Sequence, residues 1–247
     1  MKKLYTLLAL TISFSMNAQL TAVTEGGNTG QRLSTSNASN HGDIGSNAVD
    51  LSYSSISGIP FGATGNSSTA MGNQTTASGD YSTSMGYLAT ASGWYSTAMG
   101  QSTTASGSRS TAMGGSTTAS GDYSTSMGRS TTASGNESTA MGYSTTASGS
   151  RSTAMGLSTR ASGNESTAMG RNTTASAEAS TAMGYYSVAS GGYGAIAMGN
   201  QTTASGDNST VMGEGGTASG AASTAMGRGT TASDYASLVI GQYNSSG

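Results

Sequence analysis

The sequence contains no cysteine and a single proline, and only 8% of its residues are charged. Without cysteine, no disulfide can stabilise the fold, although small secreted domains commonly depend on disulfides. The formal net charge of −2 provides no basic surface, which excludes nucleic-acid binding as a function class. Large aliphatic residues are also scarce. Such poverty is typical of disordered chains, but disorder also requires a high net charge, which is missing here.

The residue types that most enzymes and metal sites need are scarce as well. His41 is the only histidine, and we expect it to be solvated in a loop-like segment, with no base oriented for a nucleophilic serine. No His/Cys cluster has metal-ligand spacing, and the recurring aspartate of calcium-binding β-rolls is absent. Gly26–Gly30 lacks the Lys-Ser/Thr of a phosphate loop. We therefore expect no catalytic residues, no metal and no cofactor.

The first eighteen residues have the pattern of a secretory signal peptide. Lys2 and Lys3 precede an apolar run from Leu4 to Phe14, and Ala18 supplies the small residue expected at a cleavage site. The run is too short to span a membrane. We therefore predict export, with Gln19 as the mature N-terminus and no membrane span in this chain.

From Asn66 onward the sequence repeats every fourteen residues. In each period two variable residues precede Ser-Thr-Ala-Met-Gly, and two more precede Thr-Thr-Ala-Ser-Gly; one extra residue within Gly191–Gly194 breaks the spacing. A fixed short period indicates a solenoid, threonine favours strands, and glycine favours tight turns. The sequence therefore predicts an all-β fold, a parallel β-roll of about thirteen coils, each with two strands and two turns.

Strand alternation assigns the side chains to faces. In Ser96–Met99, Ser96 and Ala98 share one face, while Thr97 and Met99 share the other. We expect alanine and small hydroxyls inside a thin roll and a methionine column outside; the opposite arrangement, with methionine inside, is the alternative. A long apolar stripe marks a protein interface and predicts lateral association in a cyclic oligomer. The predicted interface consists of Met71, Met85, Met99, Met113, Met127, Met141, Met155, Met169, Met183, Met198, Met212, Met226 and Ile240.

The variable pairs at the turns predict further columns of side chains, because like positions of successive coils lie one strand spacing apart. One column contains aromatic residues and an arginine, which predict either a ligand edge for glycans or another polymer, or stacking support for the roll. It continues with Glu137, Arg151 and Glu165, a predicted salt-bridge ladder. The candidate ligand edge consists of Tyr81, Trp94, Tyr95, Arg109 and Tyr123.

The other half of each period predicts an outer row of hydroxyl groups. Regular threonine rows resemble those of β-solenoid antifreeze proteins, so an ice- or crystal-binding function is one alternative and a structural spacer is another. Ordinary solvated strand residues explain the same pattern. The candidate hydroxyl face consists of Thr104, Ser106, Thr118, Ser120, Thr132 and Ser134.

Composition divides the chain into segments. We predict a signal peptide at 1–18, a linker and N-terminal cap at 19–62, the β-roll at 63–241 and a tail at 242–247. Within the second segment, Gly26 to Gly45 is rich in Gly, Asn and Ser and is typical of a linker. Ala48–Ser52 has the pattern of an irregular first strand, and Pro60 and Phe61 fit a cap over the open edge of the roll.

Ala195–Gly199 and Ser237–Gly241 resemble the Ser-x-Ala-apolar-Gly repeats of YadA-like heads in trimeric autotransporter adhesins. The resemblance covers Asn66 to Gly241, although methionine mostly stands where the family prefers Ile or Val. It implies a left-handed parallel β-roll and a side-by-side homotrimer. It also implies display on a bacterial surface, associated with the outer membrane or extracellular, and attachment to host, environmental or glycan surfaces.

The sequence ends at Gln242–Gly247 without the coiled-coil stalk or the membrane-anchor strands of that family. Self-export as an autotransporter is therefore not expected from this sequence by itself. Two alternatives follow: the sequence is part of a longer chain, or the head is secreted or held by another protein.

Overall fold

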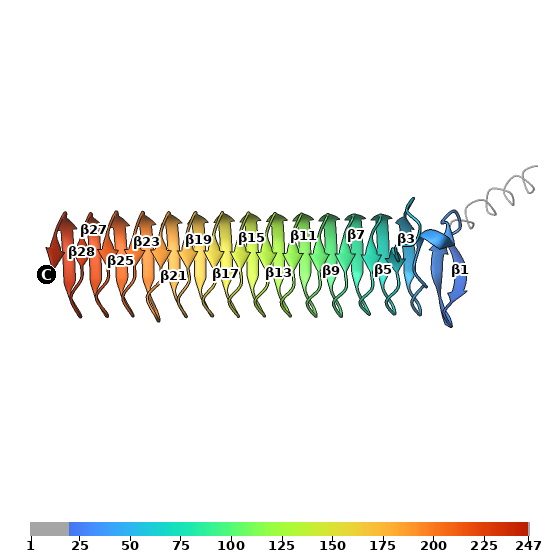
Figure 1. Cartoon of the computed structure of the whole chain (residues 1–247), viewed down its shortest axis with the longest axis horizontal. Coiled ribbons are helices and arrows are strands. Elements are labelled where there is room, and N and C mark those ends of the chain that lie inside the picture. Colours follow the sequence, from blue (N-terminus) through green and yellow to red (C-terminus); the bar gives the residue numbers. More distant parts are fainter. Residues whose placement is uncertain (1–19, 247) are drawn as a thin grey trace, which may run out of the picture. The chain divides into compact units, whose positions relative to one another are not determined.

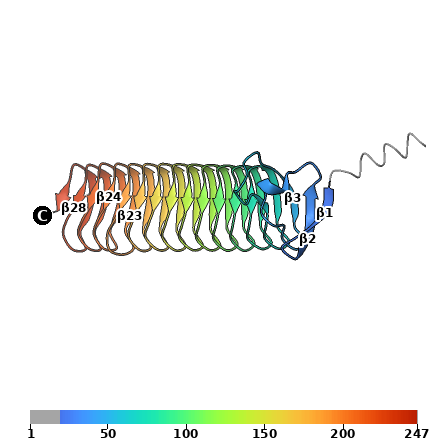
Figure 2. The same ribbon diagram turned by 45° about the vertical axis from the view of Figure 1, so that its right-hand side comes forward.

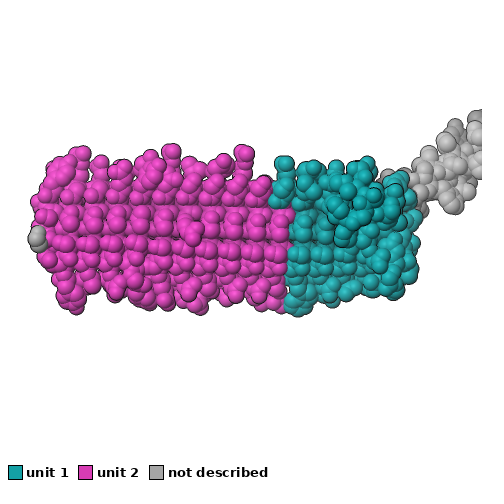
Figure 3. Space-filling view, viewed as in Figure 1, with its two compact units in different colours: residues 1–102 teal, residues 103–247 magenta. Residues whose placement is uncertain are grey.

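The computed structural model describes residues 20–246, so the predicted signal peptide and its cleavage site lie outside the described residues. The described residues are all-β, with one short 3-10 helix, η1 (Ala38–Asn40), and no α-helix. The chain divides into two compact units, residues 1–102 (unit 1) and 103–247 (unit 2) (Figure 3). In each unit, parallel strands about fourteen residues apart are stacked as a β-solenoid, which confirms the predicted fold class.

Unit 1 begins with an antiparallel hairpin and continues as parallel coils. Strand β1 (Leu20–Glu25) pairs with β2 (Asn28–Leu33), and β2 pairs in parallel with β3 (Val49–Tyr53) (Figure 1). The longer strands that follow are β5 (Thr69–Asn73), β7 (Thr83–Tyr87) and β9 (Thr97–Gln101). The short strands of the second sheet are β4 (Gly62–Ala63), β6 (Thr76–Ala77) and β8 (Thr90–Ala91).

The linker prediction for Gly26–Gly45 is wrong, because this stretch contains β2 and η1. Its glycines permit close packing rather than a loose connection: a Cβ on Gly30 would lie 2.5 Å from Cγ1 of Ile44. The expected strand at Ala48–Ser52 is confirmed as β3, which pairs in register with β5 and places Leu51 beside Met71. The parallel stack therefore starts before the regular repeat does.

Unit 2 contains only parallel coils, and its strands lie side by side from β11 to β29 (Figure 1). The first sheet consists of β11 (Thr111–Gly115), β13 (Thr125–Arg129), β15 (Thr139–Tyr143), β17 (Thr153–Leu157), β19 (Thr167–Arg171), β21 (Thr181–Tyr185), β23 (Ile196–Asn200), β25 (Thr210–Glu214), β27 (Thr224–Arg228) and β29 (Leu238–Gln242). The second consists of β10 (Thr104–Ala105), β12 (Thr118–Ala119), β14 (Thr132–Ala133), β16 (Thr146–Ala147), β18 (Arg160–Ala161), β20 (Thr174–Ala175), β22 (Val188–Ala189), β24 (Thr203–Ala204), β26 (Thr217–Ala218), β28 (Thr231–Ala232) and β30 (Ser245–Ser246).

Backbone hydrogen bonds join each coil to the next on both sheets and at the turns. Thr125 N donates to Ser138 O at 2.9 Å on the first sheet, and Thr118 N donates to Thr131 O at 2.9 Å on the second. At a turn, Tyr123 N donates to Ser108 O at 2.8 Å. The turns of successive coils are correspondingly aligned along both margins of the stack in unit 2 (Figure 2). This bonding satisfies the backbone of a fold that has almost no large apolar residues.

The interior is built from alanine and small hydroxyl side chains, as the strand alternation predicts. Ala98 and Ser96 are fully buried in unit 1, and Ala105 and Thr103 are fully buried in unit 2. The methionines are absent from the core, so the alternative that placed them inside the roll is wrong. A core only one or two alanines thick offers little apolar burial per residue, and we attribute the order of the roll chiefly to backbone bonding and close coil contact.

Glycine is required where successive coils approach most closely. A Cβ on Gly121 would lie 2.1 Å from the carbonyl oxygen of Gly135 in the next coil. Gly128 has the same problem against Gly142 and also a φ of +118°. The second residue of most turns is left-handed as well, even where it is not glycine; Tyr123, for example, has a φ of 58°. These positions cost backbone strain that the coil-to-coil hydrogen bonds offset.

The repeat departs from this glycine rule at Ala177 and, in its last coil, at Asp234. Ala177 occupies the position of Gly163, and the following coil contains the extra residue within Gly191–Gly194. The register shifts from fourteen to fifteen there, as Thr181 pairs with Ile196. The extra residue therefore falls at the turn next to the added methyl group.

Candidate interaction surfaces

The methionine face is the outer face of the first sheet, and its side chains are aligned in register. In unit 1 it consists of Leu51, Met71, Met85 and Met99. In unit 2 it consists of Met113, Met127, Met141, Met155, Met169, Met183, Met198, Met212, Met226 and Ile240. Most of these side chains are half-buried by their neighbours; Met71 is 37% and Ile240 is 59% exposed. Each unit thus presents a flat apolar stripe in unbroken register, which is a feature of interfaces.

We call the turns that precede the strands of the first sheet the leading edge and the turns that follow them the trailing edge. The predicted aromatic column lies on the leading edge. In unit 1, the rings of Tyr81 and Tyr95 stack with centroids 4.7 Å apart, and Trp94 packs edge-on against Tyr95 at 4.4 Å. In unit 2, Arg109 lies over the ring of Tyr123 at 5.1 Å and donates to its hydroxyl. The expected stacking is confirmed for Tyr81 with Tyr95 and for Arg109 with Tyr123.

The predicted salt-bridge ladder on the leading edge forms only in part, because no arginine among the described residues pairs with Glu137. Arg151 pairs with Glu165 at 2.6 Å, with side chains 58% and 49% exposed. Solvent screens such a pair, which contributes ~1 kcal/mol or less to stability. The first residue of several leading turns is Asp or Asn because its side chain accepts a backbone N–H one coil earlier: Asp122 from Ser108 at 2.9 Å. Polar residues on this edge therefore support the fold as well as being available to ligands.

The trailing edge carries a second set of arginine and tyrosine side chains that sequence analysis missed. Three arginines lie over tyrosine rings of the next coil: Arg129 over Tyr143 at 5.6 Å, Arg171 over Tyr185 at 5.4 Å, and Arg228 over Tyr243 at 5.7 Å. The fourteen-residue spacing of Arg129 and Tyr143 could have predicted this contact, since the same spacing predicted the contact of Arg109 with Tyr123 on the leading edge.

The candidate hydroxyl face lies on the outside of the second sheet. Thr104, Thr118 and Thr132 are half-buried and in register, while Ser106, Ser120 and Ser134 are exposed. The threonine row is interrupted where β18 has Arg160 and β22 has Val188. The face is therefore regular over a few coils but not along the whole sheet.

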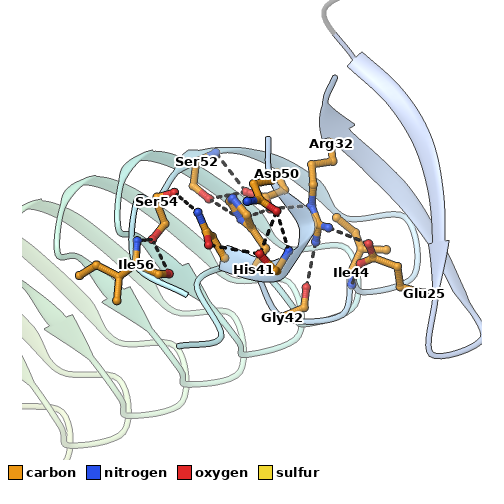
Figure 4. A network of polar contacts seen from close by, with 12 residues as sticks. Glu25, Arg32, His41, Gly42, Ile44, Asp50, Ser52, Ser54 and Ile56 are labelled. Carbon is orange, nitrogen blue, oxygen red and sulfur yellow. Dashed lines mark hydrogen bonds and ion pairs between the residues drawn. The ribbon is translucent and has the colours of Figure 1, made fainter. Parts of the chain in front are cut away.

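A buried polar network in unit 1 surrounds His41, which sequence analysis wrongly placed in solvent. His41 Nδ1 lies 3.0 Å from Asp50 Oδ2, and these side chains are 1% and 0% exposed (Figure 4). Arg32 donates to Asp50 at 3.1 Å, to Glu25 at 2.7 Å and to Gly42 O at 2.8 Å. The network joins β1, β2, β3 and the loop after η1, so its contacts are those of a structural cap.

The chemistry of this network is that of a stabilised carboxylate. Burial by itself would raise the pKa of Asp50, but hydrogen bonds from His41 and Ser52 outweigh burial and hold the pKa below its ordinary value of 3.8. Ser52 Oγ donates to Asp50 Oδ1 at 2.6 Å and lies 3.4 Å from His41. The serine therefore bonds the carboxylate more closely than it approaches the imidazole, which is not the arrangement of a nucleophile activated by histidine.

Acidification is expected to loosen this cap. Because the pKa of Asp50 is lower in the folded protein, its stabilisation is full above the unfolded value of 3.8 and is lost as pH falls through the folded pKa. Hydrogen-exchange mass spectrometry, corrected for intrinsic rates, should show β2 and β3 losing protection below about pH 4. In Asp50→Asn the protection should be lower already at neutral pH and should change less with acid; an equal acid response in both proteins would contradict this role.

Residues 20–246 contain no group of three or more His, Cys, Asp or Glu side chains placed to hold a metal ion. No helix in the part of the chain that the structure describes is long and apolar enough to cross a membrane.

Comparison with known proteins gives one match. The family model for the YadA head domain repeat, two copies long, matches residues 63–89, 77–103, 91–117, 105–131, 133–159, 161–187, 190–214 and 218–244. No curated protein matches the chain.

Proposed function

Since the chain belongs to the family of YadA head domain repeats, we propose that it is an exported adhesive head that attaches to cells, matrix or glycan surfaces as a parallel homotrimer. The family belongs to the trimeric autotransporter adhesins of bacterial surfaces, and its heads are an adhesin-type, non-enzymatic kind of domain. Bacterial surface display and trimer formation of this chain are part of the proposal.

The methionine face is the observation that carries this proposal. Its side chains point away from the alanine core and stay in register from coil to coil in each unit. Burying one methionine fully is worth about 1.5–3 kcal/mol, and half-buried side chains gain part of that. Summed over many coils, burial of the methionine face between chains provides a strong driving force for lateral association.

Ligand contact is proposed for the surfaces that the methionine face leaves open. The aromatic group Tyr81, Trp94 and Tyr95 on the leading edge of unit 1 offers ring faces of the kind that bind sugars. The exposed serines of the hydroxyl face offer additional hydrogen-bonding groups. An array of weak contacts repeated on three chains would act by avidity.

Two measurements on residues 19–247 test the proposal. Light scattering should give the mass of three chains, and beads coated with the protein should adhere to some of a panel of immobilised matrix proteins and glycans. The variant Tyr81→Ser, Trp94→Ser, Tyr95→Ser should keep the mass and lose adhesion to aromatic-dependent ligands. A folded monomer would contradict the trimer, and unchanged adhesion of the variant would remove the aromatic group from the proposal.

The alternative of ice or crystal binding is less well supported by the geometry. A flat hydroxyl lattice needs many uninterrupted rows, and the exposed Arg160 and the apolar Val188 interrupt the threonine row. Thermal hysteresis of the purified protein would favour this alternative. Failure of the assembled protein to adhere to any surface would instead favour a structural spacer.

A further inference from the structure

Charge is distributed unequally between the two edges of unit 2. The leading edge carries six acidic residues and two arginines, and the trailing edge carries three arginines and one glutamate. The leading-edge residues are Arg109, Asp122, Glu137, Arg151, Glu165, Glu178, Asp207 and Asp234. The trailing-edge residues are Arg129, Arg171, Glu214 and Arg228. The leading edge is therefore acidic and the trailing edge basic.

The two edges lie at opposite ends of the strands of the first sheet. A charge on the leading edge can therefore contact a charge on the trailing edge only between chains. In any parallel assembly with its symmetry axis along the stack, the leading edge of one chain faces the trailing edge of the next. In an antiparallel pair that buries the same face, leading edge meets leading edge and trailing meets trailing. Opposite charges therefore meet in the parallel arrangement, and like charges meet in the antiparallel one.

The charges also match in height along the stack. A trailing turn lies half a coil after one leading turn and half a coil before the next, or roughly 2.4 Å from each level. In chains aligned at the same height, Arg129 of one chain lies between the levels of Asp122 and Glu137 of the next. Arg171 lies likewise between Glu165 and Glu178. Arg228 lies half a coil before the level of Asp234. Arg151 faces the level of Tyr143, a partner for cation–π contact.

The side chains concerned are available for such pairing. Arg129, Arg171 and Arg228 are exposed, and stacking on the tyrosine of the next coil holds their guanidinium groups at the edge. Among the described residues, no carboxylate pairs with Arg129 or Arg171, and none of the arginines pairs with Glu137, Glu178 or Asp234. Arg228 has a loose contact with Glu214 at 3.6 Å.

We propose that these edges are a complementary interface to a second copy of the chain: the trailing-edge arginines of one protomer pair with the leading-edge carboxylates of the next and fix the chains parallel and level. The inference rests on the proposed lateral association, to which it adds the contacts that set orientation and register. Unit 1 carries only Asp80 among the turns of its repeat, so the pairing is confined to unit 2.

Charge reversal tests the proposal. Reversing the trailing edge (Arg129→Glu, Arg171→Glu, Arg228→Glu) should weaken assembly about tenfold or more, measured as the dissociation constant by analytical ultracentrifugation. Glu214 already occupies an equivalent position, so the fold accommodates the change. Adding Glu137→Arg, Glu178→Arg and Asp234→Arg should restore assembly, because the edges are again complementary. Circular dichroism checks that each variant folds.

Orientation is read from a single cysteine in the otherwise cysteine-free chain. Ile240→Cys, on the methionine face near one end of unit 2, should form disulfide-linked dimers within the assembly under oxidation when the chains are parallel, because its copies then meet at the same height beside the symmetry axis. Absence of cross-linking in an assembled protein, or failure of the second reversal to restore assembly, would overturn the proposal.

The outcomes separate this inference from the proposed function. If the trailing-edge variant assembles like the wild type, the edge pairing is wrong while the methionine-face trimer stands. If that variant keeps its mass and loses adhesion to sulfated-polysaccharide beads, the arginine edge is a ligand site and the pairing is again overturned. A monomeric wild-type protein would remove the proposed trimer itself.

Discussion

Replacing Met113, Met127 and Met141 with aspartate is expected to convert the assembled protein into a folded monomer. The three side chains lie in register on the methionine face, on β11, β13 and β15. Each substitution removes up to about 1.5–3 kcal/mol of apolar burial and places a carboxylate where water is excluded in the assembly. Inside one chain the same positions face outward, so the coil itself should tolerate them. The measurement is molecular mass by light scattering.

The second sheet provides a matched control. Thr118, Thr132 and Thr146 occupy its outer face, in register and half-buried like the methionines. Their replacement by aspartate adds the same charge to the same coils on the opposite side. This control should keep the assembled mass. If both triple variants behave alike, net charge rather than the methionine face governs association.

Gly121→Ala is expected to destabilise the roll by roughly 3 kcal/mol, at the upper end of the range for overpacking. The added methyl group would lie 2.1 Å from Gly135 O, and backbone cannot move aside as a side-chain tip can. The coils would have to separate at this turn, which weakens the bond from Gly121 N to Ala133 O. Urea denaturation should show a lower midpoint.

Gly115→Ala is the control for this substitution, since it adds the same methyl group in a neighbouring turn. The closest atom to a Cβ on Gly115 is Arg129 Cγ at 4.0 Å, and its φ is not in the left-handed region. Stability should stay the same or rise by about 0.4–1 kcal/mol, because alanine restricts the unfolded chain. Equal losses at both positions would mean that coil spacing does not set the glycine requirement.

The sequence predicted the roll because the same local requirements recur in every coil. Strand alternation placed Ala98 inside and Met99 outside without any knowledge of tertiary contacts. Periodicity likewise placed Tyr81 beside Tyr95. A repeat predicts well because each side chain's neighbours are its own equivalents one period away.

The N-terminal cap was not predictable in this way, because its contacts occur once. His41, Asp50 and Arg32 are brought together by a hairpin, a 3-10 turn and a strand, with no spacing that reports their contact. The glycines that suggested a linker are instead sites of close approach. Linker glycines and glycines at sites of close approach have the same composition, and only tertiary packing distinguishes them.

The direction of the hydrogen bonds in unit 2 determines how the proposed adhesive head would respond to a pulling force. Because the bonds between coils run along the stack, as from Thr125 N to Ser138 O, a pull along that direction tests one coil's bonds at a time rather than many in parallel. Each coil that comes away releases fourteen residues, roughly 46–50 Å of extended chain. A head attached to a surface would therefore lengthen in steps under force, and the unfolding of each coil would dissipate work before the attachment broke.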